Sequence, residues 1–227
     1  MHIHDRYQQE IVEGMGLCPF ARRSRELGRV HRPVFMVSEG QEPAPATVAA
    51  QLGELVTREP EAEIVLLTFP TPPGHPWLEP SEFEAFLHRL RDAWTTLPAP
   101  REFYLVSFHP HAAVPSDRAL TPDSLVTLIR RSPDPVIQCV DALVLDRVRR
   151  QAQVSARERM IRELEAKDPA LAALFASSIN PDPELSSDIA KTNFEAHGSG
   201  EGLSQLEAKV AELHAARARA YGLEEQA

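Results

Sequence analysis

The sequence predicts an α/β fold with a small, mostly parallel sheet of three or more strands packed with helices, followed by a helical C-terminal region. Three apolar runs, at residues 33–37, 63–69 and 103–108, have the composition of strands, and segments with helical periodicity separate them. After residue 120 the apolar residues follow helical spacing only. Alternating strands and helices imply right-handed crossovers, so we expect the three strands to be parallel.

The first half of the chain supplies these strands and the helices between them. Apolar residues at helical spacing predict helices over residues 5–16 and 46–58. The unbroken apolar run at 63–69 indicates a strand that is buried on both faces. Residues 70–76 are rich in proline and are expected to form a loop over the end of that strand. Ser81 is expected to cap the next helix as part of a capping box.

The second half is expected to be helical. One helix begins at Thr121 and another at Asp134, and a further helix or helix pair covers residues 156–176. Residues 204–220 form an amphipathic C-terminal helix. The apolar stripe of the helix that begins at Asp134 consists of Val136, Val140, Leu143, Val144 and Val148.

Length and composition bound the class of protein. The 227 residues fit an α/β core domain over residues 1–150 and a helical extension over residues 151–227 that packs on the core. A net charge of −9 argues against nucleic acid or an anionic membrane as partner, because both need a basic face. No signal-peptide pattern and no apolar run of transmembrane length is present, so we expect a cytoplasmic protein. Cys18 and Cys139 are then expected to be free thiols.

Histidines at the end of the third strand mark the predicted centre of the chemistry. The strand runs directly into His109, Pro110 and His111, and strand ends are the usual place for a site in an open α/β sheet. His109 and His111 are spaced so that they could share a metal, with His75 or Cys18 as candidate third ligand. The alternative is a hydrogen-bonded His109 and an exposed His111.

A second pair of histidines, His2 and His4, has the same spacing. It lies at a terminus that is expected to fray, so we assign it little weight.

Cys18 lies in the segment Gly16-Leu17-Cys18-Pro19-Phe20, just past the first predicted helix. A position after a helix C-terminus raises the pKa of a thiol, which counts against a self-activated nucleophile, although His109 could act as its base. A cysteine followed by proline is also a context for thiolate ligation of haem iron. The alternative is a small apolar residue beneath a turn.

Arg131 and Ser132 precede the helix expected at Asp134. Guanidinium groups before a helix N-terminus form a plausible site for a phosphate, a carboxylate or a haem propionate. Arg130 is the weaker candidate of the arginine pair. The alternative is a surface turn in which the arginines pair with Asp134 or Asp123.

Three motifs together resemble an uncharacterised bacterial family, a domain of unknown function. They are Gly-Leu-Cys-Pro-Phe-Ala after the first helix, Val-Ser-Phe-His-Pro at the end of a strand, and Arg-Ser-Pro-Asp-Pro. The resemblance covers about residues 5–150 and, more loosely, residues 189–193, whereas residues 151–187 resemble a helical insertion. Family members often have another residue in place of His111, which weakens the metal hypothesis. The resemblance implies no activity, but it groups Cys18, His109 and Arg131 as site residues.

Three functional hypotheses follow. The first is a haem- or metal-dependent oxidoreductase in which His109 ligates haem or a single metal ion, while Arg131 and Ser132 bind an anionic group of the cofactor or the small-molecule substrate. The second is cofactor-free acid–base or Cys–His chemistry on a small anionic substrate, with His109 as the base. The third is a non-catalytic binding protein whose helical C-terminal part forms a homodimer.

Overall fold

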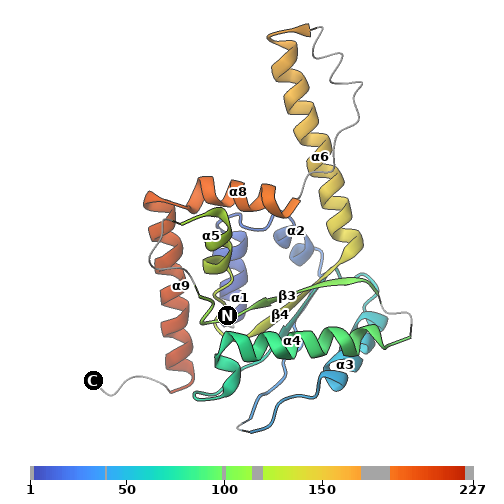
Figure 1. Cartoon of the computed structure of the whole chain (residues 1–227), viewed down its shortest axis with the longest axis vertical. Helices are drawn as coiled ribbons and strands as arrows, with labels where there is room; N and C mark the ends of the chain where they lie inside the picture. The colour runs from blue at the N-terminus through green and yellow to red at the C-terminus, as the bar shows by residue number, and fades with distance from the viewer. Residues whose placement is uncertain (1–2, 39, 99–100, 114–119, 170–184, 223–227) are drawn as a thin grey trace.

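The computed structural model describes residues 3–38, 40–98, 101–113, 120–169 and 185–222. Within these residues the chain forms one four-stranded sheet with helices on both faces (Figure 1), which confirms the mixed α/β class. The strands are β1 (Val30–His31), β2 (Ile64–Thr68), β3 (Phe103–Phe108) and β4 (Val136–Asp141).

The order of the strands is β1-β2-β4-β3. β1 is parallel to β2, but β4 lies between β2 and β3 and is antiparallel to both. Gln138 on β4, for example, is opposite Leu66 on one side and Val106 on the other. The prediction of a mostly parallel sheet is therefore wrong, although β2 and β3 do run in the same direction.

The error comes from the segment that was predicted to be a helix beginning at Asp134. Val136, Ile137 and Val140 are β-branched and fit a pleated, buried strand, and they form β4 instead. The helix begins eight residues later. The carboxylate of Asp141 accepts a hydrogen bond from the backbone N–H of Leu143 at 2.8 Å and caps it.

The first predicted strand, at residues 33–37, is only partly formed. β1 ends before Pro33, which has no N–H to donate to a ladder. Val34 then makes a single parallel bridge with Thr68, and the backbone N–H of Phe35 donates to the carbonyl of Thr68 at 2.9 Å. The segment follows β2 without becoming a continuous strand.

Helices form the rest of the described chain, and the C-terminal region is helical as predicted. The N-terminal helix continues as a π-helix, η1, and the helix predicted to be capped by Ser81 has Glu79 at its N-cap because Pro80 occupies the first turn. The helices are α1 (Ile3–Arg6), η1 (Tyr7–Glu13), α2 (Ala21–Glu26), α3 (Pro45–Arg58), η2 (Pro76–Leu78), α4 (Pro80–Thr95), α5 (Pro122–Ile129), α6 (Ala142–Glu165), α8 (Leu185–His197) and α9 (Gly200–Ala220).

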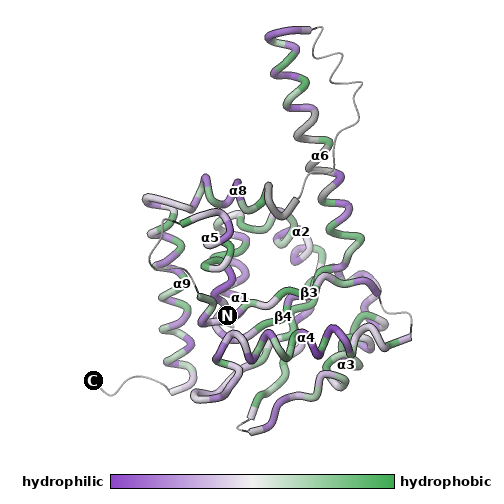
Figure 2. The backbone as a smooth tube through the Cα atoms, in the orientation of Figure 1, coloured by the Kyte–Doolittle hydropathy of each residue, from purple (hydrophilic) through white to green (hydrophobic). Residues whose placement is uncertain are grey.

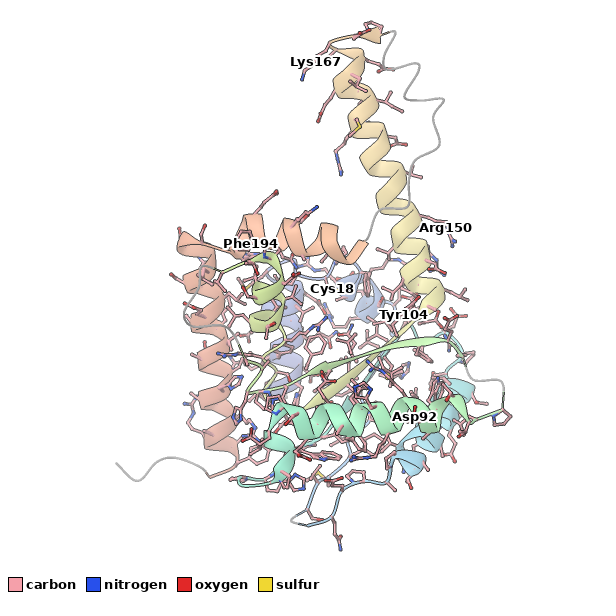
Figure 3. All side chains as sticks on the ribbon, in the orientation of Figure 1. Cys18, Asp92, Tyr104, Arg150, Lys167 and Phe194 are labelled. Carbon is pink, nitrogen blue, oxygen red and sulfur yellow. The ribbon has the colours of Figure 1, made fainter. Side chains whose placement is uncertain are left out.

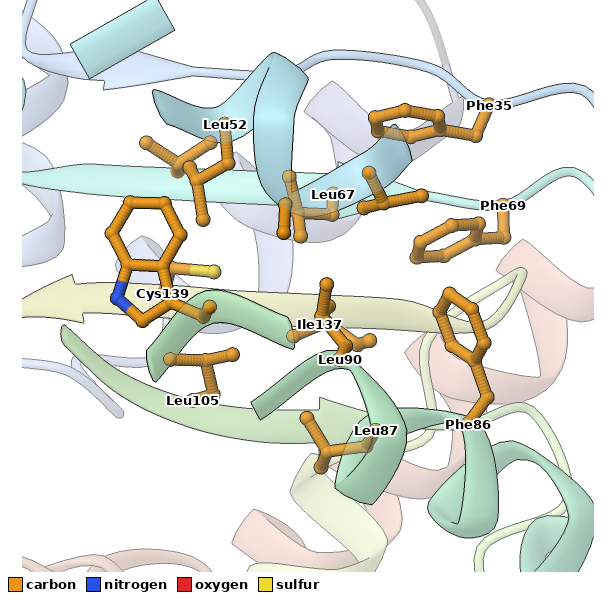
Figure 4. Packing of buried hydrophobic residues seen from close by; sticks show 14 of the residues in the cluster. Phe35, Leu52, Leu67, Phe69, Phe86, Leu87, Leu90, Leu105, Ile137 and Cys139 are labelled. Carbon is orange, nitrogen blue, oxygen red and sulfur yellow. The ribbon is translucent and has the colours of Figure 1, made fainter. Parts of the chain in front are cut away.

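One face of the sheet packs against α3 and α4 and forms the largest apolar core (Figure 4). Val65 and Leu67 of β2, with Ile137 and Cys139 of β4, point into this layer. Cys139 is fully buried, and burial raises the pKa of its thiol. The alternation of side chains along each strand sends the intervening residues to the opposite face.

The opposite face lies toward α1, η1, α2 and α8 (Figure 1). α9 packs against η1, and its residues Leu206, Val210 and Leu213 form one apolar cluster with Tyr7 and Ile11. The N-terminal helix and the C-terminal helix thus form one packed layer.

α6 starts on the sheet and then projects away from the rest of the chain (Figure 1). It crosses residue 150, the predicted boundary between the core and the helical extension. Its outer turns carry both hydrophobic and hydrophilic residues (Figure 2). The end of the helix predicted at 156–176 lies outside the described residues. Among the described helices, none combines the length and the apolar composition that crossing a membrane requires.

Candidate functional site

A cavity of about 880 Å³ lies between the second face of the sheet and the N-terminal helices. This size is within the range of cavities that hold small organic ligands. Cys18 and Tyr104, labelled in Figure 3, line it from the segment before α2 and from β3. The sheet contributes mainly apolar side chains to its wall, namely Ile64, Leu66, Tyr104, Val106, Phe108, Val136 and Gln138.

His4 is one of the polar residues on the wall of this cavity, and it is bound to the buried carboxylate of Asp134. Asp134 Oδ2 accepts from His4 Nε2 at 3.1 Å and from the Tyr221 hydroxyl at 3.0 Å. Its Oδ1 accepts from Arg217 Nε at 2.8 Å and from the backbone N–H of Thr71 at 3.4 Å. One carboxylate therefore joins α1, α9 and the loop after β2.

Two opposing influences set the pKa of Asp134. Burial alone would raise it, but the hydrogen bond from His4 and the charge of Arg217 outweigh burial, so the pKa lies below its ordinary value. An ionised carboxylate can only accept hydrogen bonds, so the proton between the two side chains belongs to His4 Nε2.

Two arginines also line the cavity, and they differ in their contacts. Arg32 donates to the backbone carbonyl of His4 and to Gln8, and it lies 3.7 Å from the carboxylate of Asp5. The guanidinium of Arg130 makes no hydrogen bond or ion pair with any residue that the structure describes. Burial lowers the pKa of both side chains.

His109, the predicted centre of the chemistry, is buried beside a second cavity of about 200 Å³. Its Nδ1 accepts from the backbone N–H of His111 at 3.0 Å, and its Nε2 donates to the backbone carbonyl of Trp77 at 2.8 Å. Burial lowers its pKa, an effect that the bond to Trp77 opposes only in part. The exposed His111 binds the carbonyl of Leu78 through Nδ1. The two histidines hold η2 against the end of β3.

This geometry does not fit the hypothesis that His109 and His111 share a metal, because both ring nitrogens of His109 already have partners. Within the described part of the chain, no group of three or more His, Cys, Asp and Glu side chains is arranged to hold a metal ion. Ligation of haem iron by His109 meets the same obstacle.

Cys18 does line the large cavity. It lies between the end of η1 and the start of α2, as expected just past the first helix, and hydrogen bonds from the backbone N–H groups of Phe20 and Ala21 act to lower the pKa of its thiol. Burial nevertheless raises the pKa of the thiol above its ordinary value. The thiol is therefore the form that meets the cavity at neutral pH.

Arg131 and Ser132 precede a strand rather than a helix, so the predicted anion site at a helix N-terminus is not formed. Arg131 Nε donates to the carbonyl of Ala112 at 2.9 Å, and Ser132 Oγ donates to the carbonyl of Asp134 at 2.6 Å. Ser132 lines the large cavity, whereas Arg131 lines neither of the two cavities described here. The structure does not bring Cys18, His109 and Arg131 together in one of them.

Comparison with known proteins gives a family. A family model described as "Protein of unknown function (DUF1415)" matches residues 3–167. The chain belongs to the DUF1415 family. No curated protein and no solved structure matches it.

The DUF1415 match includes His4, Cys18, Arg130 and Asp134. It also includes α6, part of the region interpreted from the sequence as an insertion. Arg217 and Tyr221, which bind Asp134 from α9, lie outside it.

Sequence reasoning gave His4 little weight, ranked Arg130 below Arg131, and named Asp134 only as the start of a helix and as a partner for the arginines in a surface turn. His4 depends on a contact with a residue 130 positions away, which no local pattern reveals. Asp134 had a signal, since it lies between Pro133 and Pro135 next to apolar β-branched residues, but it was interpreted as a helix start.

Proposed function

We propose that this DUF1415 protein binds a small, largely apolar molecule in the 880 Å³ cavity and acts on it there by acid–base chemistry. The observation that carries the proposal is His4, which lines a mainly apolar cavity and is hydrogen-bonded to the buried carboxylate of Asp134. A carboxylate that accepts from one nitrogen of an imidazole fixes its tautomer and favours the protonated ring. The acid–base hypothesis formulated for His109 thus moves to His4.

The binding part of the proposal is tested by filling the cavity. The neutral dye aminoanthracene, which fluoresces in apolar surroundings, is expected to bind the wild-type protein saturably. Val106 lines the cavity from β3, so Val106→Trp places an indole inside it and is expected to weaken the dye affinity by about tenfold or more. Fluorescence titration measures both affinities.

Leu27→Trp is the matched control, because Leu27 is exposed and does not line the cavity. Its dye affinity is expected to equal that of the wild-type protein. Equal dye binding by Val106→Trp and Leu27→Trp would show that the dye does not occupy this cavity. A haem absorption band near 400 nm in the purified protein would instead support the haem hypothesis, with Cys18 rather than His109 as the ligand.

The catalytic part is tested with His4→Gln. The glutamine amide can still donate to Asp134, but it cannot transfer a proton at neutral pH. Incubation with a bacterial metabolite extract, followed by mass spectrometry, is expected to show compounds that wild-type protein consumes and His4→Gln does not, with a loss of about 100-fold or more in rate. Dye affinity serves as the control for an intact cavity. Unchanged consumption by His4→Gln would remove His4 from the reaction.

A further inference from the structure

The ligand class can be named more closely, on the basis of the proposed function. We infer that the ligand is an amphipathic anion, with an apolar body against the sheet and a carboxylate group bound by Arg130. This assigns the anion site to Arg130 in place of Arg131.

The backbone of Arg130 is fixed by hydrogen bonds, while its guanidinium has no partner among the residues that the structure describes. Its carbonyl accepts from the backbone N–H groups of His109 and Ser132, and its own N–H donates to the carbonyl of Val126 at 3.1 Å. Arg130 lines both the 880 Å³ cavity and the adjoining 200 Å³ cavity. No hydrogen bond or ion pair joins the guanidinium to any other residue in the described ranges. The backbone is therefore held in place, and the guanidinium has no acceptor within the described part of the chain.

The other arginines of this region are already used. Arg131 donates to the carbonyl of Ala112, and Arg217 is paired with Asp134. Arg32 has Gln8 and a backbone carbonyl as acceptors. Arg130 alone among these four lines the cavity with no protein acceptor in the structure described.

An unpaired cation at an apolar wall attracts an anion strongly. Partly buried charges in proteins are normally paired, because removal from water is costly, and a low local dielectric strengthens the attraction to a counter-charge. The acids that influence Arg130 are few. Glu84 raises its pKa from a distance, but the Glu84 carboxylate already accepts from the Ser107 hydroxyl. A carboxylate ligand would supply the missing acceptor in the bidentate geometry that guanidinium groups favour.

The cavity also offers a place for the rest of such a ligand. Leu66, Val106 and Val136 come from three adjacent strands and supply apolar side chains to the cavity wall, with Gln138 between Leu66 and Val106. Val126, four residues before Arg130, lines the same cavity, and so does Phe108, whose neighbour His109 donates its backbone N–H to the carbonyl of Arg130. An alkyl or aromatic body can therefore lie on the sheet while its carboxylate meets the guanidinium.

The test compares three ligands that share one chain and differ in the head group: decanoate, decanol and decylamine. Each is used to displace aminoanthracene from the protein. Wild-type protein is expected to bind decanoate about 10-fold to 100-fold more tightly than decanol, and decylamine most weakly. Arg130→Met keeps the apolar stem without the charge, and it is expected to remove the preference for decanoate while leaving decanol affinity unchanged.

Arg131→Met is the matched control, because it makes the same chemical change one residue away at a side chain that lines neither cavity, and it should keep the preference. Arg130→Lys should retain part of it. If wild-type protein binds decanoate and decanol equally well, the inference is wrong, although the cavity remains a binding site. If the dye and all three ligands fail to bind, the proposed function itself is wrong. The comparison of head groups in wild-type protein needs no variant to fold.

Discussion

Asp134→Ala is expected to lower the free energy of unfolding by about 3–5 kcal/mol, the usual cost of removing one partner from a buried ion pair. The carboxylate is fully buried and accepts four hydrogen bonds, from His4, Thr71, Arg217 and Tyr221. Its loss leaves the guanidinium of Arg217, which is only 11% exposed, without its counter-charge. Urea unfolding at neutral pH measures the change.

Asp123→Ala provides the control, since Asp123 is an exposed acid in the first turn of α5, and its removal is expected to cost less than about 1 kcal/mol. The double variant Asp134→Ala/Arg217→Met should be more stable than the sum of the two single changes predicts, because it leaves no orphaned charge. A cost below about 1 kcal/mol for Asp134→Ala would mean that water replaces all its partners.

His109→Ala is expected to destabilise the fold by about 2–4 kcal/mol and to leave ligand affinity in the large cavity nearly unchanged. The imidazole is 4% exposed, both of its nitrogens are hydrogen-bonded, and its ring packs on Phe83. Truncation removes these contacts and opens a void beneath η2. Unfolding curves and dye titration measure the two effects separately. A ligand or catalytic role, as the sequence suggested, would produce the reverse pattern.

The pH dependence of this variant provides a second measurement. The folded pKa of His109 is lowered, so the unfolded chain takes up a proton below pH about 6.5 while the native ring stays neutral. The stability that neutral His109 contributes is therefore lost as the pH falls from about 6.5 toward its folded pKa. His109→Ala should show a shallower loss of stability between pH 7 and pH 5. The wild-type protein, measured over the same pH range, provides the reference slope.

Local sequence patterns were sufficient to predict most of the individual helices and strands. The apolar run at 63–69 corresponds to β2, and residues 103–108 form β3 with the predicted bounds. The helix expected at 46–58 corresponds to α3. Short apolar runs are sufficient to predict the two strands, and the helical spacing of the apolar residues is sufficient to predict α3.

The predicted sheet topology was wrong because of a single segment. Val136, Val140 and Val144 are four residues apart, which fits a helix, but the first two lie in β4 and the third in α6. β4 and α6 follow each other without a connecting turn, so valines from two different elements together show a spacing of four residues that is typical of a helix. Because β4 is the strand between β2 and β3, losing it changed the predicted pairing from antiparallel to parallel.

The sequence predicted which segments form the candidate site, but not all of the residues that line it. Cys18 and Ser132 line the large cavity as expected, whereas Phe108 and Arg130 line it in place of their predicted neighbours His109 and Arg131. Arg130 and Arg131 have the same side chain, and only the turn after α5 decides which of the two lines the cavity. His4 was set aside as terminal, yet α9 packs over its helix and holds it in place.

The convergence of His4, Asp134 and Tyr221 on one carboxylate sets the order in which the protein can assemble during synthesis. Residue 4 leaves the ribosome first, and its partner Asp134 emerges after most of the sheet has been made. Tyr221 follows 87 residues later. Contacts across such sequence distances form slowly, so the N-terminal helix must wait for much of translation without the layer that covers it. The nascent chain is therefore expected to expose Tyr7 and Ile11 until α9 emerges, which makes this helix a segment for chaperones to protect.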